Sequence, residues 1–152
     1  MKLATIAEMM SIVEAIAQRS KDPKRKVGAL VVNRDGSPLS WGYNGFARGI
    51  TDAEARLTNE QYKLAHIVHA EQNAVYNAAK MGISLDGGIL LCNLHPCIQC
   101  SNAIIQAGIS TIICPHRIDT TSKWWAQRAA ATRLLEEAGV MVITVDDFYN
   151  IL

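Results

Sequence analysis

His69-Ala70-Glu71 and Pro96-Cys97-Ile98-Gln99-Cys100 are the two short stretches around which the rest of the chain is organised. Together they supply one imidazole and two thiols, which are ligands soft enough to bind zinc. Three protein ligands leave the fourth tetrahedral position open for water, as in catalytic zinc sites. If a helix begins at each stretch, the two cysteines share a helix face. Glu71 then points away from the metal ligands and stands over the water.

The cysteine pair also admits other interpretations. One is a zinc knuckle with a fourth protein ligand from His66 or His95, and another is a redox-active Cys-x-x-Cys pair. Both leave Glu71 without a role. We therefore predict one catalytic zinc ion, with His66 and His95 near the site or partly exposed. A second zinc ion, or Mg²⁺ accompanying a nucleotide, stays an open alternative. Cys92 and Cys114 lie in apolar runs and are expected in the core.

The chemistry expected of this centre is hydrolytic. Two thiolates and a neutral imidazole balance the charge of Zn²⁺, and bound zinc lowers the pKa of water towards neutrality. Glu71 can take a proton from that water and later protonate a leaving amine. Both stretches are expected at helix N-termini, where the helix dipole favours thiolate over thiol.

Length and composition indicate a single domain over residues 1–152. The chain is 49% hydrophobic and 19% charged, with a net charge of +1. This balance argues against general attraction to nucleic acid or to a membrane surface. No apolar run approaches the roughly 18 residues that span a bilayer, and Met1 to Met10 lack a signal-peptide layout. We expect a cytoplasmic, reducing setting, in which Cys-x-x-Cys favours metal binding over a structural disulfide.

The expected elements alternate between helix and strand. The polar stretch from Gly45 to about Ala65 shows no clear period and is expected to be a long functional loop. This order predicts an α/β fold with three α-β-α layers and a five-stranded mixed sheet, with both motifs at one end of the sheet. Helices are expected over 3–19, 69–81, 97–107 and 122–138, and strands over 27–33, 39–43, 88–94, 110–114 and 140–145.

Several further segments carry a family resemblance. They are Ser20-Lys21-Asp22-Pro23, Lys26-Val27-Gly28-Ala29, Gly42-Tyr43-Asn44-Gly45, Asn73-Ala74, 104–109 and 134–140. The two central stretches match the H-x-E…P-C-x-x-C pattern of zinc-dependent nucleobase deaminases. With the other segments, the chain resembles the deoxycytidylate (dCMP) deaminases of the compact bacterial and phage type, within the cytidine deaminase-like superfamily. The segments Ser-Lys-Asp-Pro and Gly-Tyr-Asn-Gly narrow the resemblance from the superfamily to the deaminases that act on dCMP.

The resemblance implies deamination of dCMP to dUMP, which feeds thymidylate synthesis, in a cytidine deaminase-like fold. It implies zinc at His69, Cys97 and Cys100, with Glu71 as the proton shuttle. Asn44 would hydrogen-bond the deoxyribose. The pyrimidine edge would be held by the backbone around Val27 to Ala29 and at Ala70. Members of the family are typically homohexamers, and many are activated by dCTP and inhibited by dTTP.

One position departs from the family pattern. A proline usually follows the residue after Gly45, and Ala47 stands there in this chain. In regulated members this segment contributes to effector binding, and the resemblance assigns that role to Gly42, Gly45 and Arg48. Because Ala47 removes a fixed φ angle and loosens the loop, we expect dCTP control to be weak or absent.

A 5′-phosphate on the substrate would need cations or backbone N–H donors. Lys21 and Lys26 match the family motif and are predicted to contact the phosphate. The neighbouring Lys24 and Arg25 are expected in a solvated turn.

Other side chains are expected either to contact the nucleotide or to support the fold. Tyr43 is expected to stack on the nucleotide or pack in the core, and Trp124 to flank the base or pack. Basic residues expected to close over the nucleotide, line a subunit interface or lie near the pocket rim are Arg48, Arg56, Lys63, His116 and Arg117.

Alternatives to dCMP deamination remain on the sequence alone. The substrate could be dCTP, a 5-substituted dCMP or a tRNA adenosine, although the near-neutral charge weighs against a stable nucleic-acid complex. A non-catalytic, zinc-stabilised nucleotide-binding module is a rival from another class. The presence of Glu71 weighs against it.

Overall fold

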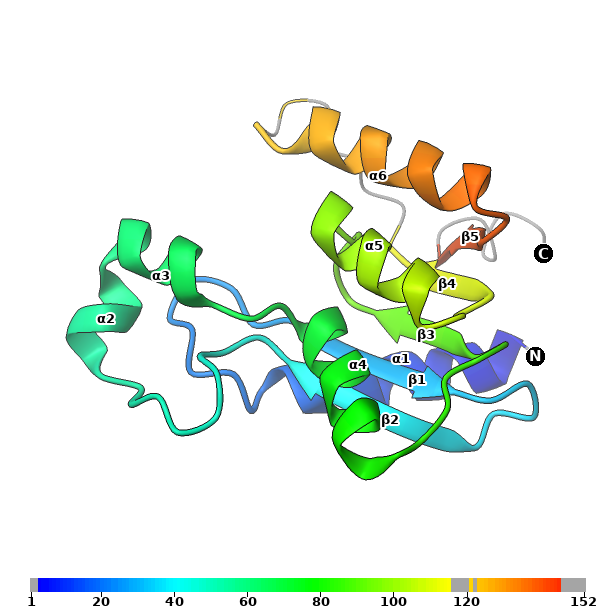
Figure 1. Cartoon of the computed structure of the whole chain (residues 1–152), viewed down its shortest axis with the longest axis horizontal. Helices are drawn as coiled ribbons and strands as arrows, with labels where there is room; N and C mark the ends of the chain where they lie inside the picture. The colour runs from blue at the N-terminus through cyan, green and yellow to red at the C-terminus, as the bar shows by residue number, and fades with distance from the viewer. Residues whose placement is uncertain (1–2, 116–120, 122, 146–152) are drawn as a thin grey trace.

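A five-stranded mixed sheet forms the middle layer of the protein (Figure 1). The computed structural model describes residues 3–115, 121 and 123–145. The strand order is β2-β1-β3-β4-β5, with β1 antiparallel to both neighbours and β3, β4 and β5 mutually parallel. This confirms the mixed sheet expected from the sequence. The strands are β1 Gly28–Val32, β2 Pro38–Tyr43, β3 Ile89–Cys92, β4 Thr111–Cys114 and β5 Met141–Thr144.

Helices cover both faces of the sheet because β1, β3 and β4 are apolar on both sides. On β1, Ala29 and Val31 belong to the core under α4, α5 and α6, whereas Leu30 and Val32 belong to the core under α1. This alternation follows from the two-residue repeat of a strand and gives the expected three layers. The helices are α1 Leu3–Ala17, α2 Glu54–Thr58, α3 Glu60–His66, α4 Ala70–Met81, α5 Ile98–Gln106 and α6 Trp125–Glu137.

Two glycines on neighbouring strands let a helix backbone come very close to each face. A Cβ atom on Gly28 would lie 2.3 Å from the carbonyl oxygen of Val13 in α1. A Cβ atom on Gly42 would lie 2.4 Å from the amide nitrogen of Ala74 and 2.5 Å from the carbonyl oxygen of Ala70, both in α4. Real Cβ atoms do not come this close to backbone, so both helices need glycine opposite them.

Helix α4 also covers the outer edge of β2. The Asn73 amide donates to the carbonyl of Tyr43 at 2.8 Å, and the Asn77 amide donates to the carbonyl of Trp41 at 2.6 Å. Ser40 adds a third link, from its hydroxyl to the carbonyl of Ala74 at 2.7 Å. These bonds fix the start of α4 relative to the end of β2.

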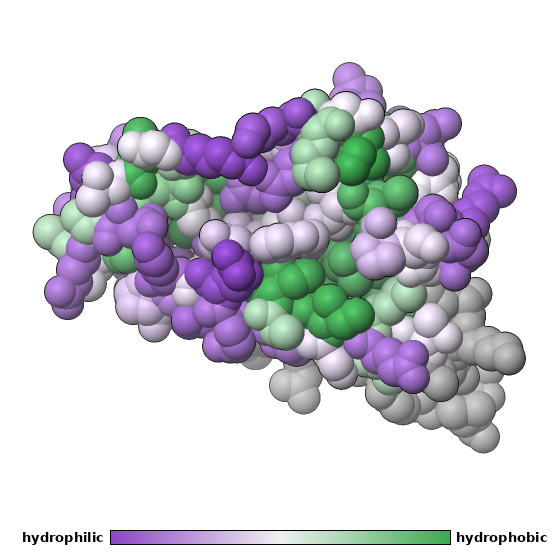
Figure 2. Space-filling view, turned by 90° about the horizontal axis from the view of Figure 1, so that it is seen from below, coloured by the Kyte–Doolittle hydropathy of each residue, from purple (hydrophilic) through white to green (hydrophobic). Residues whose placement is uncertain are grey.

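The expectation of a loop without helices over residues 45–65 was wrong. The structure has α2 and α3 there, of 5 and 7 residues, and they project beyond the end of the sheet (Figure 1). We call residues 52–66 the arm. Helices of fewer than two turns give no apolar repeat to recognise. In the view from below, hydrophobic residues gather in the middle of the molecule and hydrophilic ones predominate at the arm (Figure 2).

Three ion pairs join the arm to the segment 20–26. Lys63 and Asp22 form a buried pair at 2.9 Å, with side chains 8% and 5% exposed. Two solvent-exposed pairs lie beside it, Lys21 with Asp52 at 2.9 Å and Lys24 with Glu60 at 3.5 Å. The arm is thus linked to this segment by one buried and two exposed ion pairs. None of the helices that the structure describes is long and apolar enough to cross a membrane.

Candidate active site

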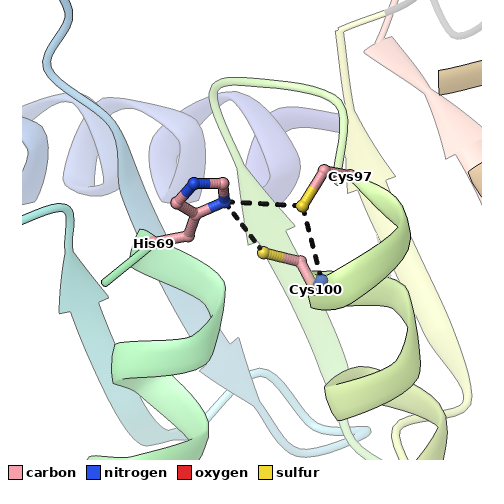
Figure 3. Close-up of side chains that lie close together, drawn as sticks. All are labelled: His69, Cys97 and Cys100. Carbon is pink, nitrogen blue, oxygen red and sulfur yellow. Dashed lines mark hydrogen bonds between the residues drawn. The ribbon is translucent and has the colours of Figure 1, made fainter. Parts of the chain in front are cut away.

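The two motifs of the sequence meet at the N-termini of α4 and α5 (Figure 3). His69 is the residue before α4, and Cys97 is the residue before α5. Cys100 lies one turn further along α5. The Nδ1 atom of His69 is 3.4 Å from Sγ of Cys97 and 3.3 Å from Sγ of Cys100. Among the residues that the structure describes, these three form the group whose ligand atoms lie close enough to share one metal ion.

These separations fit a tetrahedral zinc site. With Zn–N of about 2.0 Å and Zn–S of about 2.3 Å, tetrahedral geometry places nitrogen and sulfur about 3.5 Å apart. The observed distances of 3.3 and 3.4 Å agree with this value. The donor set of one imidazole and two thiolates suits Zn²⁺, and it leaves a fourth position for water.

The local electrostatics favour a cation at this point. The pKa of Cys97 is lowered to about 4, mainly by hydrogen bonding from the Cys100 thiol and also by the hydrogen bond and charge of His69, against the opposing effect of burial. The hydrogen bond with Cys97 raises the pKa of Cys100, and burial adds to this effect. The hydrogen bond with Cys97 also raises the pKa of His69. Two thiols thus compete for one negative charge, and a divalent ion would allow both to ionise.

Glu71 lies in the first turn of α4 and is only 3% exposed. Burial raises the pKa of its carboxyl, although its own backbone N–H and the charge of His69 oppose this rise. A carboxyl with a raised pKa beside a metal site is suited to accept and return a proton. Glu71 thus lies buried within interaction range of His69 and Cys100, and its role as the proton shuttle stays a prediction. The His69 ring points towards the two cysteines (Figure 3).

Within the part of the chain that the structure describes, the other histidines and cysteines lie outside the group of three. His66 is exposed and stacks on Tyr62, with ring centroids 3.9 Å apart. His95 is buried, and its two ring nitrogens lie 3.0 Å from the Pro96 carbonyl and from the Thr132 hydroxyl. The remaining two cysteines are buried in the core, as expected: Cys92 and Cys114.

Asn44 lies at the same end of the sheet as the candidate zinc centre. Its Oδ1 accepts from the backbone N–H of Val27 at 2.8 Å, and its Nδ2 donates to the carbonyl of Arg25 at 2.9 Å. The side chain is 6% exposed, so its most evident task is to hold this backbone. Its contact with a deoxyribose stays a prediction. The alanines expected to hold the base, Ala29 and Ala70, are fully buried beside it.

The two lysines predicted to bind phosphate already have partners. Lys21 pairs with Asp52, which raises the pKa of the Lys21 ammonium. The Lys26 ammonium donates to the carbonyl of Gln18, at the end of α1, at 3.4 Å. A phosphate would therefore compete with a carboxylate for Lys21 and with a helix end for Lys26.

The two aromatic residues assigned to the nucleotide have different surroundings. The Tyr43 ring stacks on Trp41 and packs against the core under α1, on the sheet face opposite to α4. Trp124 is half-buried at the start of α6, and the Lys123 ammonium lies 5.0 Å from its ring centroid. The structure does not bring Tyr43 to the zinc centre. His116 and Arg117 lie outside the described residues.

The residues assigned to effector binding contact α4 and the strand that leads to it. Gly42 allows α4 to approach β2 closely. Gly45 forms an isolated bridge with Val68, the residue before His69. Arg48 donates to the side-chain oxygen of Asn77. All three contacts serve the fold, and an effector role stays a prediction.

Two features near the zinc centre were not predicted from the sequence. One is the buried Lys63–Asp22 pair, because Lys63 was assigned to an open loop. The other is Asn93, whose amide binds the backbone just before β1. An asparagine directly after an apolar strand and shortly before Pro96-Cys97 was an available signal.

Known proteins resemble this chain in sequence and in structure. Residues 4–115 match the family described as the cytidine and deoxycytidylate deaminase zinc-binding region, and the chain belongs to this family. It is 37% identical over 132 residues to ComE operon protein 2 of Bacillus subtilis, covering 86% of this chain and 66% of that protein. It is 38% identical over 112 residues to the deoxycytidylate deaminase of Homo sapiens, and the match covers 68% of this chain and 60% of the human protein.

A solved structure extends the comparison over nearly the whole chain. The dCMP deaminase of the cyanophage S-TIM5, in complex with dCMP and dUMP, superposes with a TM-score of 0.75 at 33% identity. The match covers 95% of this chain and 98% of the phage chain. The chain thus spans about two thirds of the Bacillus protein and less of the human one, but nearly all of the phage enzyme. Together with the donor set, family membership gives a Zn²⁺ site at His69, Cys97 and Cys100.

Proposed function

We propose that this protein catalyses the hydrolytic deamination of dCMP to dUMP, with release of ammonia. The observation that carries the proposal is a buried carboxyl group, Glu71, beside a zinc-competent group of His69, Cys97 and Cys100. The choice of dCMP is supported by the match to the phage enzyme, which holds dCMP and dUMP and has nearly the same length as this chain. We also propose that residues 1–152 act as one deaminase domain.

The balanced reaction replaces the exocyclic amine of cytosine by oxygen. When bound to the three ligands, zinc would activate a water as the nucleophile that attacks C4 of the pyrimidine. Glu71 takes a proton from the nucleophile and delivers it to the ring nitrogen N3. It takes the second proton of that oxygen and gives it to the amine, which leaves as ammonia when the C4–N bond breaks. The raised pKa of Glu71 allows it to hold a proton between these steps.

The remaining contacts follow the family resemblance. Asn44 is proposed to face the deoxyribose, and backbone groups at Ala29 and Ala70 to face the base. Lys21 and Lys26 are proposed phosphate contacts once they exchange their present partners. We further propose a cytoplasmic homohexamer in which Ala47 weakens control by dCTP and dTTP. Light scattering tests the assembly, and rates at sub-saturating dCMP with and without dCTP test the regulation.

The substrate is tested by ammonia release from dCMP, CMP, dCTP, deoxycytidine and an adenosine-containing RNA hairpin. We expect the highest kcat/KM for dCMP. A higher value for any other compound would replace dCMP as the substrate. Absence of turnover with all five, in a protein that carries zinc, would favour a binding module.

The role of Glu71 is tested by Glu71→Gln, which keeps the size of the side chain and removes its acid–base function. We expect kcat to fall by about 10²- to 10⁴-fold while zinc content stays at the wild-type level. Gln72→Glu is a useful control, because it adds a carboxyl group one position along the same turn and should not restore activity when combined with Glu71→Gln. Activity that persists in Glu71→Gln would overturn the mechanism.

A further inference from the structure

Two asparagines at strand ends bind the same backbone segment, 25–28, from opposite sides. The first is Asn44, at the end of β2. Its backbone N–H donates to the carbonyl of Val27 at 3.2 Å, and its Oδ1 accepts from the N–H of Val27 at 2.8 Å. Its Nδ2 donates to the carbonyl of Arg25 at 2.9 Å. Asn44 thus binds both backbone polar groups of Val27, and its side chain also binds the carbonyl two residues earlier.

Asn93, at the end of β3, repeats the same pattern one residue further along. Its backbone N–H donates to the carbonyl of Gly28 at 3.4 Å, and its Oδ1 accepts from the N–H of Gly28 at 3.0 Å. Its Nδ2 donates to the carbonyl of Lys26 at 3.4 Å. The same Nδ2 lies 3.2 Å from a carboxylate oxygen of Glu14, which links the arrangement to α1.

In both places a side-chain amide makes the hydrogen bonds that the main chain of the neighbouring strand would otherwise make. The chain turns away after β2 towards Gly45 and after β3 towards Pro96, so the main-chain carbonyls no longer face β1. The side-chain oxygens of Asn44 and Asn93 replace them, and segment 25–28 is bonded on both edges like a central strand. We call these two residues with segment 25–28 the asparagine clamp.

The clamp connects this segment to both helices that carry the candidate zinc ligands. On one side, Gly45 follows Asn44 and pairs with Val68, through N–H to carbonyl bonds of 3.1 and 2.8 Å. His69 comes next. On the other side, Asn93 lies four residues before Cys97 in the same turn. The position of segment 25–28 relative to the zinc centre therefore depends on both asparagines.

We propose that Asn93 is a positioning residue for the deamination, acting through the asparagine clamp. Segment 25–28 presents the exposed cationic side chains of Arg25 and Lys26 at the sheet end that carries the zinc centre. Without the Asn93 side chain, this segment loses the bonds to the Gly28 N–H and the Lys26 carbonyl on one edge, and it must be ordered again when the nucleotide binds. The inference rests on the proposed function, and it predicts a cost in substrate binding with little effect on proton transfer at Glu71.

The test uses Asn93→Ala and Asn93→Asp in the full chain loaded with zinc. Asn93→Ala removes all side-chain bonds and should raise KM for dCMP about tenfold, the effect of losing one to two neutral hydrogen bonds. The change in kcat should stay within about threefold. Asn93→Asp keeps the acceptor for Gly28 but loses the donor to Lys26 and adds charge beside Glu14, so it should raise KM by an intermediate amount.

Asn33→Ala is the matched control. Asn33 follows the other end of β1, and its Oδ1 accepts from the N–H groups of Asp35 and Ser37 at 3.1 and 2.9 Å. Asn33 and Asn93 are both half-buried, so loss of either side chain should lower Tm to a similar degree. A purely structural role for Asn93 would leave KM unchanged in both variants.

Two further measurements do not depend on turnover. Amide hydrogen exchange at Gly28 should accelerate in Asn93→Ala and stay unchanged in Asn33→Ala. Calorimetric dCMP affinity, measured in a Glu71→Gln background, should weaken about tenfold when Asn93→Ala is added. An unchanged KM and affinity, slow exchange at Gly28, or loss of zinc from Asn93→Ala would each overturn the proposal. If Asn93→Ala does not fold, KM, dCMP affinity and exchange at Gly28 are measured in Asn93→Asp instead. A wild-type protein that binds zinc and fails to deaminate dCMP would instead defeat the proposed function.

Discussion

The sheet with its covering helices and the arm of residues 52–66 are held in place by different forces. Around the sheet, apolar side chains fill both faces, and helices reach within backbone contact of Gly28 and Gly42. The arm is joined to segment 20–26 by three ion pairs. Apolar packing depends little on pH and salt, whereas ion pairs depend on pH and, where they are exposed, on salt as well. The zinc centre thus belongs to the part of the molecule that is less sensitive to solution conditions.

The largest effect is expected from a substitution at Gly42, which would disturb the packing of α4 on the sheet. Gly42→Ala would place a methyl group against the backbone of α4 and should cost about 4 kcal/mol of stability or more. Because α4 begins directly after His69, zinc content should fall as well. Gly28→Ala is the control, since it displaces α1 by a similar clash on the other face.

We expect Gly28→Ala to lower stability by a comparable amount and to retain zinc in the fraction that folds. Urea unfolding gives the free energies, and metal analysis of the folded protein gives the zinc content. Equal loss of zinc in both variants would show that the centre depends on the whole sheet and not on the approach of α4.

The next largest loss of stability is expected at Lys63–Asp22, the buried ion pair that attaches the arm. Lys63→Met removes the cation and leaves the Asp22 carboxylate buried, which should cost about 3 kcal/mol. Lys80→Met, at an exposed position on α4, should have almost no effect. Urea unfolding measures both variants. A similarly small change for Lys63→Met would mean that the arm is held by other contacts.

Acid should weaken the same attachment. Burial favours the neutral form of Asp22, but bonds from the Lys24 N–H, the Lys63 ammonium and the Arg25 N–H outweigh it and lower the pKa of Asp22 below 3.8. The stabilisation is therefore complete above pH 3.8 and is lost as the pH falls through the lower pKa of the folded state. The Asp22→Asn variant has no carboxyl group at this position, so its stability lacks this contribution to the pH dependence.

The stability difference between wild type and Asp22→Asn should thus be largest near neutral pH. It should narrow as the pH falls below 3.8, as measured by urea unfolding across the acidic range. A constant difference would rule out Asp22 as the titrating group.

The smallest effect is expected at the exposed pairs of the arm. The Lys21 side chain is 68% exposed, so solvent and salt screen its attraction to Asp52. Lys21→Ala should leave Tm unchanged within error, in low and in high salt. A clear loss of Tm, greater in low salt, would show that the three pairs act as a network.

The sequence predicted the sheet and the zinc group well for a physical reason. Apolar strands and helices leave periodic patterns, and metal ligands must have particular chemistry and spacing. His69 and the two cysteines were therefore recognisable without any knowledge of their distances. The mixed sheet of five strands followed from the alternation with helices.

Features that depend on pairs of distant residues could not be predicted in this way. Nothing in the chain indicates that Lys63 is buried against Asp22, 41 residues away. The Tyr43 ring turned out to lie on the α1 face, although Gly42, next to it, gave a clue. In an alternating strand the small residues mark the face that a helix approaches closely, and the large neighbours must point to the opposite face.

The two asparagines of α4 have a consequence for how the protein behaves at high concentration. A strand at the edge of a sheet offers free carbonyl and amide groups to which another chain can add a strand, and this is a common route to fibres. On β2 the carbonyls of Trp41 and Tyr43 are already occupied by Asn77 and Asn73. Removing these two amides would free both carbonyls and open a template for aggregation.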